Sequence, residues 1–494
     1  MGSQAEISEA RAPAGGPDGS SFRRTWVQNH IDTLVALGLL VIVIACAVFD
    51  RHAPVRRFFT VDDSWSLDLF FKAHQGSWVG KDFAFSYGPL YQWLLGISEW
   101  GQGVSLGTFF RLGHLGLFAY TIGMVWLSAR LLLRQEPSWK RGLVIAGFAI
   151  PWTYFEVREA TIVLLFALML RLFDRTAESR SHYAWPAAAG SAAIAFSFLL
   201  SGDTGIYGII ALLTVAASYC ACRRSDAGAW RRILRLAACM CAGLACWCAL
   251  IGIFMGIQFW RDTLALAGTY RWAMATPFIP ADEKWNLLLV VGICFGVFAA
   301  AGRGRKDKGF SLAARPAFQL AAPLFSLACL QSSLVRSDWY HVFFGWFAAI
   351  ALAAFSLFAA RNSSSLLSTL RIAGGFALLV VYIYPPATFL PVVVASALAS
   401  TSRQVTECPS GTRPLDGVCL GHSPYLELQG VATHLQAQST TADSVAIFPD
   451  ENIFGDLARR RVAGGVLQNY AAAGNVLVDR QLQGLEEQKP ALAV

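Results

Sequence analysis

Long apolar runs separated by short polar stretches recur along most of the chain. A helix needs about 20 apolar residues to cross the hydrocarbon core of a bilayer, and the pattern predicts about eleven such helices. The sequence therefore predicts an α-helical polytopic membrane protein. The expected spans lie near 31–49, 105–127, 142–154, 160–173, 186–202, 205–222, 236–257, 285–301, 316–332, 341–360 and 372–398.

Two of these runs, 142–154 and 160–173, are short for a full crossing. The charged stretch Phe155–Glu159 separates them and suggests a re-entrant or half-crossing pair. Irregular backbone at membrane depth is tolerated only where it lines protein or water. Nine full crossings plus such a pair would leave the two chain ends on the same sides of the membrane as eleven crossings.

Composition agrees with a membrane protein, because 55% of residues are hydrophobic and only 15% are charged. A soluble domain carries about a quarter charged residues. The net charge of +8 comes from basic residues placed between apolar runs, which argues for topology signals rather than nucleic-acid binding. With the N-terminus inside, 22 Lys and Arg residues fall on cytoplasmic segments and 10 on outer loops. We therefore expect the N-terminus in the cytoplasm and the C-terminal region outside it.

The chain divides into three parts. Residues 1–30 form a cytoplasmic N-terminus, predicted to be disordered because it is rich in Gly, Ala, Ser and Pro. Residues 31–398 form the transmembrane domain, with a long outer loop at 50–104. Residues 399–494 form an extracytoplasmic region.

The C-terminal region has the pattern of a small or incomplete α/β unit. Residues 445–448 and 475–478 look like strands, and 423–437 and 453–470 look like helices. The last residues, 489–494, resemble the start of another buried strand. We expect this region to cover the outer face and to help choose the acceptor.

Two cysteines, Cys408 and Cys419, lie in a polar, turn-rich part of this region. If the region is extracytoplasmic, its compartment is oxidising and a disulfide between them is expected. A pair of free thiols is the alternative. The other nine cysteines lie in or beside the spans, where cysteine acts as a small apolar residue.

The first outer loop carries the strongest chemical signal. Apolar positions from Trp65 to Phe71 predict an amphipathic helix along the membrane surface, with Asp62 and Asp63 at its N-terminus. Adjacent carboxylates there could act as a general base or bind a cation. The alternative is that they only cap the helix and face solvent.

This arrangement resembles the GT-C superfamily, the multi-span glycosyltransferases that take sugar from a polyprenyl-phosphate carrier, in the manner of protein mannosyltransferases and aminoarabinose transferases. Asp62-Asp63 match its acidic pair. Gly80-Lys81-Asp82-Phe83 and Tyr87-Gly88-Pro89 are similar to the segment that follows. Arg336-Ser337-Asp338-Trp339-Tyr340-His341 resembles a later turn. The motifs cover about 50 residues, and the topology covers most of the chain.

The resemblance implies a GT-C-like fold and sugar transfer at the extracytoplasmic face, with Asp62 as general base and Asp63 as its orienter. Cations would stabilise the leaving phosphate. An acidic pair is compatible with a divalent cation such as Mg²⁺ or Mn²⁺ but does not require one. The substrate-binding candidates are Asp82, Tyr87, Arg111, Glu156, Arg158, Asp203, Arg271, Arg336, Asp338 and His341.

Several of these residues also have purely structural interpretations. Arg111 could snorkel to the interface, and Arg271 could be an interfacial anchor. Glu156, Arg158 and Glu159 could form a mutually paired turn, and Asp203 could cap the next helix.

The competing functional class is a transporter or flippase for a lipid-linked or anionic substrate. Transporters place ionisable residues near the middle of their spans, whereas here nearly all lie at the outer ends. We expect a multi-pass protein of the bacterial inner membrane that binds membrane lipid and a lipid-linked sugar donor. Its acceptor would be a glycan, lipid or protein, and no nucleic acid is expected to bind.

Overall fold

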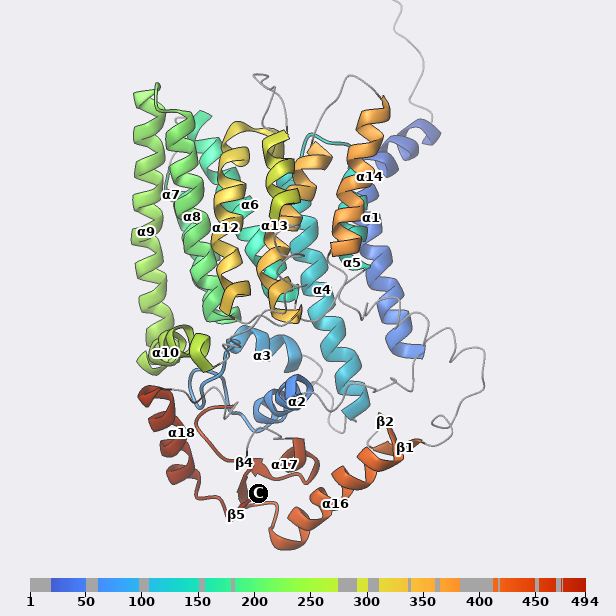
Figure 1. Ribbon diagram of the computed structural model, residues 1–494, viewed down its shortest axis with the longest axis vertical. Helices are drawn as coiled ribbons and strands as arrows, with labels where there is room; N and C mark the ends of the chain where they lie inside the picture. The colour runs from blue at the N-terminus through green and yellow to red at the C-terminus, as the bar shows by residue number, and fades with distance from the viewer. Residues whose placement is uncertain are drawn as a thin grey trace, which may run out of the picture.

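The computed structural model describes a helical bundle with a smaller mixed region beyond one of its ends (Figure 1). The N-terminus of the first helix lies at the opposite end of the bundle from this mixed region. The residues described are 19–49, 61–96, 106–150, 156–178, 183–273, 291–300, 311–335, 339–359, 365–382, 412–415, 418–448, 453–467, 472 and 474–494.

The bundle helices fall where the apolar runs predicted them, which confirms the helical membrane fold. A further apolar helix, Val291–Ala300, lies within the expected span 285–301. The remaining bundle helices are α1 (Gly19–Phe49), α4 (Leu106–Leu132), α5 (Ser138–Ala149), α6 (Glu156–Glu178), α7 (Ala184–Leu200), α8 (Gly202–Cys222), α9 (Ala227–Met255), α12 (Pro316–Val335), α13 (Trp339–Ala359) and α14 (Ser365–Tyr382).

Within the described residues, 4 helices are long and apolar enough to cross a membrane on their own composition. Five shorter apolar helices accompany them in the same part of the chain. The count of eleven crossings stays a prediction. The four are Val27–Ala45, Leu115–Leu132, Gly202–Cys222 and Ala227–Met255.

Helices α5 and α6 differ from the pair of short spans that the sequence suggested. At about 1.5 Å per residue, the 23 residues of α6 extend about 35 Å, enough to cross the hydrocarbon core. The 12 residues of α5 extend only about 18 Å. The apolar run at 160–173 is shorter than α6 because charged residues occupy both ends of the helix.

Helix α13 lies inside the bundle and helix α9 at its edge, as the buried fractions of their residues show. Nearly every residue of α13 from Trp346 to Ala359 is buried, as expected of a helix that is apolar on all sides. Helix α9 stands at the edge of the bundle (Figure 1), and only 17% of its apolar window is buried. Its uncovered apolar surface faces the region that lipid would occupy.

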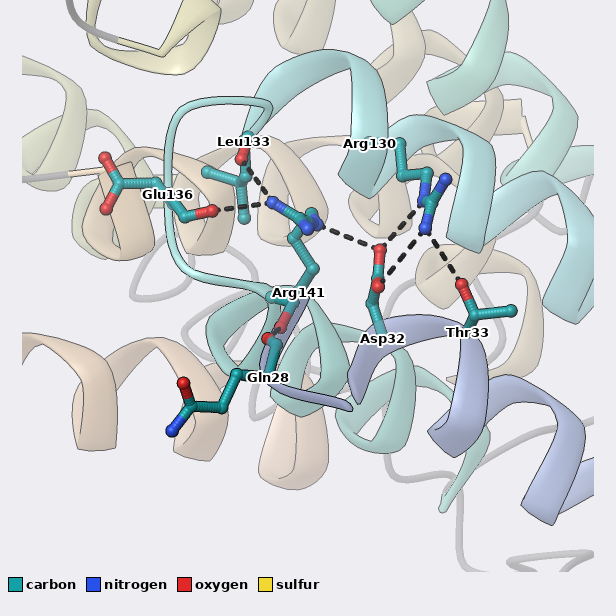
Figure 2. A network of polar contacts seen from close by, with 8 residues as sticks. Gln28, Asp32, Thr33, Arg130, Leu133, Glu136 and Arg141 are labelled. Atoms are coloured by element: carbon teal, nitrogen blue, oxygen red, sulfur yellow. Dashed lines mark hydrogen bonds and ion pairs between the residues drawn. The ribbon is translucent and has the colours of Figure 1, made fainter. Parts of the chain in front are cut away.

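One carboxylate joins three helices at the end of the bundle away from the mixed region. Asp32 of α1 is completely buried and accepts hydrogen bonds from Arg130 Nε of α4 and Arg141 Nε of α5, each at 2.9 Å (Figure 2). Arg130 Nη2 also donates to Thr33 Oγ1 at 2.9 Å, and Arg141 Nη1 donates to the Glu136 carbonyl at 2.6 Å. One buried guanidinium group, that of Arg141, and one partly exposed guanidinium group, that of Arg130, therefore share one negative charge.

A layer of shorter helices lies between the bundle and the mixed region (Figure 1). It contains α2 (Val61–His74), α3 (Pro89–Gly96) and α10 (Ile257–Ala273). The α2 helix begins where the sequence predicted it. Its covered surface, however, is more than one face, because Phe70 is buried as well as Trp65, Asp68, Leu69 and Lys72 on one side. It is thus packed inside the protein and does not lie on an open membrane surface.

The C-terminal region is a small α/β unit, as predicted. Strands β1 (Thr412–Leu415) and β2 (Val418–Gly421) form an antiparallel hairpin. Strand β3 (Ser444–Ala446) pairs in parallel with β4 (Arg461–Val462) and with β5 (Leu492–Ala493), in the order β4-β3-β5. The predicted strand at the end of the chain is therefore confirmed.

Strand β3 matches the strand predicted at 445–448, whereas two other predictions for this region were wrong. Helix α16 (His422–Gln438) matches the expected helix at 423–437. The expected helix at 453–470 ends early, as α17 (Ile453–Leu457), because the chain turns at Arg459 with a φ of 56° and enters β4. The expected strand at 475–478 is the start of helix α18 (Asn475–Gln488), which buries Leu477, Gln481 and Gly484 on one face.

Backbone pairing fixes the C-terminal region to the loop that follows α2. The Ala84 N–H donates to the Gly465 carbonyl at 2.8 Å, and the Leu467 N–H donates to the Ala84 carbonyl at 3.0 Å. Arg480 of α18 adds a hydrogen bond from Nη2 to the Lys81 carbonyl at 3.0 Å and lies 3.6 Å from the Asp262 carboxylate of α10.

Replacing Asp32 with Asn should destabilise the bundle strongly. The substitution leaves the buried Arg141 without its charged partner, and breaking a buried ion pair in this way costs about 3–5 kcal/mol. The partly exposed Arg130 loses the same partner at a smaller cost. The midpoint of thermal unfolding in detergent measures the effect. Asp479→Asn, at an exposed position of α18, is the control. Equal midpoints for the two variants would contradict the assigned role of Asp32.

Candidate active site

The acidic pair lies at the N-terminus of α2, as the sequence predicted. Asp62 and Asp63 occupy its first turn, where the helix dipole favours negative charge. Their backbone is described and their side chains lie outside the description. The helix stands at the end of the bundle that the C-terminal region covers (Figure 1).

The segment after α2 is held to that helix by one buried amide, that of Gln92 in α3. Its Oε1 accepts from the Val79 N–H at 2.8 Å, and its Nε2 donates to the carbonyls of Ser77 and Leu69 at 2.9 and 3.2 Å. Gln92 is completely buried, so all of these bonds are shielded from water. Sequence reasoning missed this residue, because only its three distant partners reveal its role.

Asp82, a predicted substrate-binding residue, is exposed and shapes the turn. Its Oδ2 accepts from the Trp78 N–H at 2.7 Å. The same turn requires glycine at Gly80, where φ is 81° and a Cβ atom would lie 2.4 Å from Cδ2 of Phe259.

Three of the predicted residues come together from distant parts of the chain. Arg158 lies in the first turn of α6, and its Nη1 is 3.1 Å from Oδ2 of Asp203 in the first turn of α8. The Arg158 guanidinium carbon also lies 4.7 Å from the ring centroid of Tyr87, a cation–π contact. We refer to Tyr87, Arg158 and Asp203 as the arginine cluster.

Backbone pairing brings Tyr87 to this cluster. Tyr87 forms an antiparallel bridge with Ser201, and the Gly88 N–H donates to the Leu200 carbonyl at 2.7 Å. A Cβ atom at Gly88 would lie 2.2 Å from the Leu199 carbonyl oxygen, so only glycine permits this approach. The Tyr87 ring is buried and stacks on Trp65 of α2 with centroids 5.3 Å apart.

Asp203 has the structural role that its sequence context offered as an alternative, and its part in substrate binding stays a prediction. It helps to cap α8, since its Oδ1 accepts from the Thr204 N–H at 2.9 Å and from the Ser201 hydroxyl. Its other oxygen faces Arg158. A capping residue therefore also holds the cation of the cluster in place.

Glu159, next to Arg158, adds a buried carboxylate that the predicted substrate-binding set omits. It is 4% exposed, and its Oε1 lies 3.9 Å from Arg158 Nε. Its Oε2 has no hydrogen-bond partner among the described residues. Burying a carboxylate away from water is costly unless it is paired, so Glu159 is a candidate functional group. The sequence signal that could have indicated this role is the position of Glu159 at the start of the long apolar stretch of α6.

The remaining predicted residues are placed only in part. The backbones of Arg111, Glu156, Arg271 and His341 belong to α4, α6, α10 and α13, and their side chains lie outside the description. Arg336 and Asp338 lie outside the described residues altogether. So does Cys408, the expected disulfide partner of Cys419, which is in β2.

A metal site is not apparent in the described part of the chain, where no three His, Cys, Asp or Glu side chains gather as ligands. This statement does not extend to the side chains of Asp62 and Asp63. A divalent cation at the acidic pair therefore stays a possibility that the sequence allows and does not require.

Comparison with known proteins finds similar structures but no similar sequence family. No protein-family model matches the sequence, and no curated protein matches it. The crystal structure of ArnT from Cupriavidus metallidurans bound to undecaprenyl phosphate matches with a TM-score of 0.52 and 16% identity, covering 95% of this chain and 89% of that one. The apo structure of the same ArnT gives a TM-score of 0.42 at 17% identity, covering 93% and 89%.

ArnT is a GT-C glycosyltransferase, and the match to its lipid-bound structure extends over nearly the whole of both chains. The protein therefore has the polytopic GT-C fold that the sequence motifs led us to expect. At this level of identity the likeness concerns the fold.

Gly80→Ala should disturb the loop more than Gly76→Ala. Both glycines have positive φ, 81° and 75°, so both substitutions strain the backbone. Only Gly80 also meets a side chain, that of Phe259, whereas nothing lies within 4 Å of a Cβ at Gly76. The midpoints of thermal unfolding of the two variants measure the difference. Adding Phe259→Ala to Gly80→Ala tests the cause, because a double variant without any relief would contradict a clash at this site.

Proposed function

We propose that this protein is a glycosyltransferase that moves a sugar from a polyprenyl-phosphate donor to an acceptor at the extracytoplasmic face of the membrane. The observation that carries the proposal is the combination of the GT-C fold with an acidic pair in the first turn of α2. The matched ArnT structure holds undecaprenyl phosphate, which is a carrier of the proposed class.

The proposed chemistry is a single displacement at the anomeric carbon. The Asp62 carboxylate takes the proton of the acceptor hydroxyl as its oxygen attacks the anomeric carbon. The bond from that carbon to the phosphate oxygen breaks, and the electron pair leaves with the phosphate. Asp63 orients Asp62. The negative charge that develops on the phosphate requires cations nearby.

Arg158 is the candidate cation whose surroundings are described. Its contacts with Asp203 and Tyr87 fix the guanidinium, and only part of it is exposed. A fixed cation needs little reorganisation when charge develops, which is the basis of electrostatic stabilisation of a transition state. Arg111, Arg271, Arg336 and His341 are the further candidates from the sequence.

The distribution of buried charge supports a transferase over a transporter. Among the described side chains, buried or half-buried charged groups lie toward the two ends of the bundle. Arg158, Glu159 and Asp203 are in the first turns of their helices at one end. The Asp32 network, drawn in Figure 2, includes Arg130 from the last turn of α4 and lies toward the other end. A transporter would concentrate such groups near the middle of its spans.

The proposed orientation places the C-terminal region outside the cytoplasm. It is supported by the position of this region at the opposite end of the bundle from the start of α1 (Figure 1). The excess of basic residues on the segments assigned to the cytoplasm supports the same orientation. The inner membrane of a bacterium is the proposed location.

Asp62→Asn should lower the rate of sugar transfer by at least about 100-fold, because general-base catalysis contributes about 10²–10⁴-fold. Asp63→Asn should have a smaller effect, since it only orients the base. The measurement is transfer from synthetic polyprenyl-phosphate sugars by the purified full-length chain. Asp479→Asn, exposed on α18, is the control.

Two results would argue against this proposal in different ways. Unaltered transfer by both Asp62→Asn and Asp63→Asn would exclude the assigned roles of the two carboxylates, although the protein would still be a glycosyltransferase. Absence of transfer by the unmodified chain with every donor, together with movement of a lipid-linked or anionic substrate across vesicles, would favour the transporter.

A further inference from the structure

The turn that joins α8 to α9, together with the first turns of α9, carries a concentration of arginine that the proposed chemistry does not use. Residues 223–235 contain five arginines and a single carboxylate, that of Asp226. Asp226 is the N-cap of α9, and its Oδ1 accepts from the Ala229 N–H at 2.9 Å. Five positive charges therefore accompany one negative charge that already serves as a helix cap.

Backbone and side-chain bonds make this turn a fixed link between helices. The Arg223 N–H donates to the Tyr219 carbonyl of α8 at 3.0 Å, and the Asp226 N–H donates to the Arg223 carbonyl at 2.9 Å. Arg232 Nη2 donates to the Ala177 carbonyl in the last turn of α6 at 2.9 Å. The start of α9 is thus held beside the ends of both α8 and α6, and one of the five arginines is used in holding it.

The other four arginines have no such structural use. All four are exposed, and none forms an ion pair with a carboxylate in the described part of the chain. We refer to them as the basic elbow. They are Arg223 and Arg224 in the turn and Arg231 and Arg235 in α9.

The carboxylates in the last two turns of α6, beside the start of α9, are engaged by other groups. Asp174 is 2% exposed, pairs with Arg315 and accepts from the Tyr219 hydroxyl at 3.1 Å. Glu178 Oε1 lies 2.7 Å from Arg315 Nη1. Among the described residues, neither carboxylate pairs with the basic elbow, which therefore keeps its positive charge.

Helix geometry brings the two halves of the basic elbow to one level. Arg231 and Arg235 lie one turn apart, about 6 and 12 Å along the axis from the first residue of α9. The Cα–Cβ bonds of a helix tilt toward its N-terminus, and a long arginine side chain can carry its charge to the polar end of a membrane helix. Both side chains are thus directed back toward the turn that holds Arg223 and Arg224.

The apolar surface next to the basic elbow indicates the medium around it. Trp230 and Leu234 are each 42% exposed, and the exposed stripe of α9 continues to Ile253 and Phe254, which are 75% and 82% exposed. A tryptophan where an apolar stripe meets basic residues is typical of the boundary between lipid and water. The basic elbow therefore lies at the depth of lipid phosphates, with room for acyl chains along α9.

We propose that the basic elbow binds the headgroup phosphate of an anionic phospholipid, whose acyl chains lie against Trp230 and Leu234. A guanidinium group pairs with a phosphate through two N–H donors, and arginines from two helices surround this point. A zwitterionic headgroup is disfavoured because it brings its own cation next to the unpaired arginines.

The proposed lipid site is separate from the proposed site of sugar transfer. The end of α9 lies beside α10, at the end of the bundle that the C-terminal region covers, so the start of α9 is at the opposite end (Figure 1). In the orientation proposed above, this is the cytoplasmic leaflet, where basic segments next to spans attract anionic lipid. Binding there does not depend on the proposed reaction.

Lipid titration of the purified full-length chain in detergent, followed by native mass spectrometry, tests the site. The probe is phosphatidylglycerol and the reference is phosphatidylcholine. The unmodified chain should bind phosphatidylglycerol at least about tenfold more tightly than phosphatidylcholine. Arg231→Gln combined with Arg235→Gln should weaken phosphatidylglycerol binding by about 20- to 30-fold, because each arginine near a lipid surface contributes about a factor of five.

The matched control is Arg261→Gln combined with Arg461→Gln. These exposed arginines belong to α10 and β4, at the other end of the bundle, and their replacement removes the same net charge. Phosphatidylglycerol binding should change by less than about twofold, because charges much farther apart than the Debye length are screened. Equal losses in the two double variants, or equal affinities for the two lipids, would overturn the proposal.

A second pair of variants keeps the test decisive if the first pair fails to fold. Arg223→Gln combined with Arg224→Gln changes only exposed side chains of the turn and should weaken phosphatidylglycerol binding to a similar extent. Inorganic phosphate identifies the source of the bound phosphate group. At millimolar concentration and constant ionic strength it should leave lipid binding unchanged. Displacement of the lipid by inorganic phosphate would indicate a site for a soluble anion and would overturn the assignment to lipid.

Discussion

The architecture depends on the hydrogen bonds of one short backbone segment, residues 84–88. Backbone groups removed from water must find partners, and this segment finds them on both sides. Toward the bundle, the Gly88 N–H bonds to the Leu200 carbonyl. Away from it, Ala84 bonds to Gly465 and Leu467 of the C-terminal region. The loop is therefore an internal layer, and three regions far apart in sequence meet on it.

The arginine cluster is a consequence of this pairing. Tyr87 is placed beside Ser201 by the backbone, and its ring then offers a face to Arg158. Asp203 caps its own helix and pairs with the same arginine. Glu159 is left with one oxygen that has no hydrogen-bond partner among the described residues. Such a carboxylate is what a site prepared for a further partner would contain.

The sequence predicted the features that depend on local pattern. Spans followed from apolar runs, and α2 followed from an acidic start before an apolar stretch. Tyr87, Arg158 and Asp203 were chosen individually, but their proximity could not be predicted without the backbone pairing of residues 84–88. Gln92 was missed as a member of a site because its partners are distant in sequence. Glu159 was interpreted only as part of a charged turn, because its burial depends on the packing of α6.

The errors in the C-terminal region have a similar origin. Val476 and Val478 alternate as in a strand, but α18 is set by the contact of Gln481 and Gly484 with Gly464 and Gly465. The Gln481 Oε1 accepts from the Val466 N–H at 2.7 Å. A Cβ atom at Gly484 would lie 2.2 Å from the Gly465 nitrogen, so the helix fits only against this glycine pair. Tertiary contact overrode a short local pattern.

The hydrogen bond from Lys72 to the Val462 carbonyl joins residues separated by 390 positions, and that from Arg480 to the Lys81 carbonyl spans 399. Chains are made from the N-terminus, and domains generally fold in that order. The helix with the acidic pair is therefore synthesised early and receives contacts from residues synthesised much later. Assembly of this face of the bundle is thus a late event in biogenesis, and a chain halted before β4 would leave the loop at residues 76–88 uncovered.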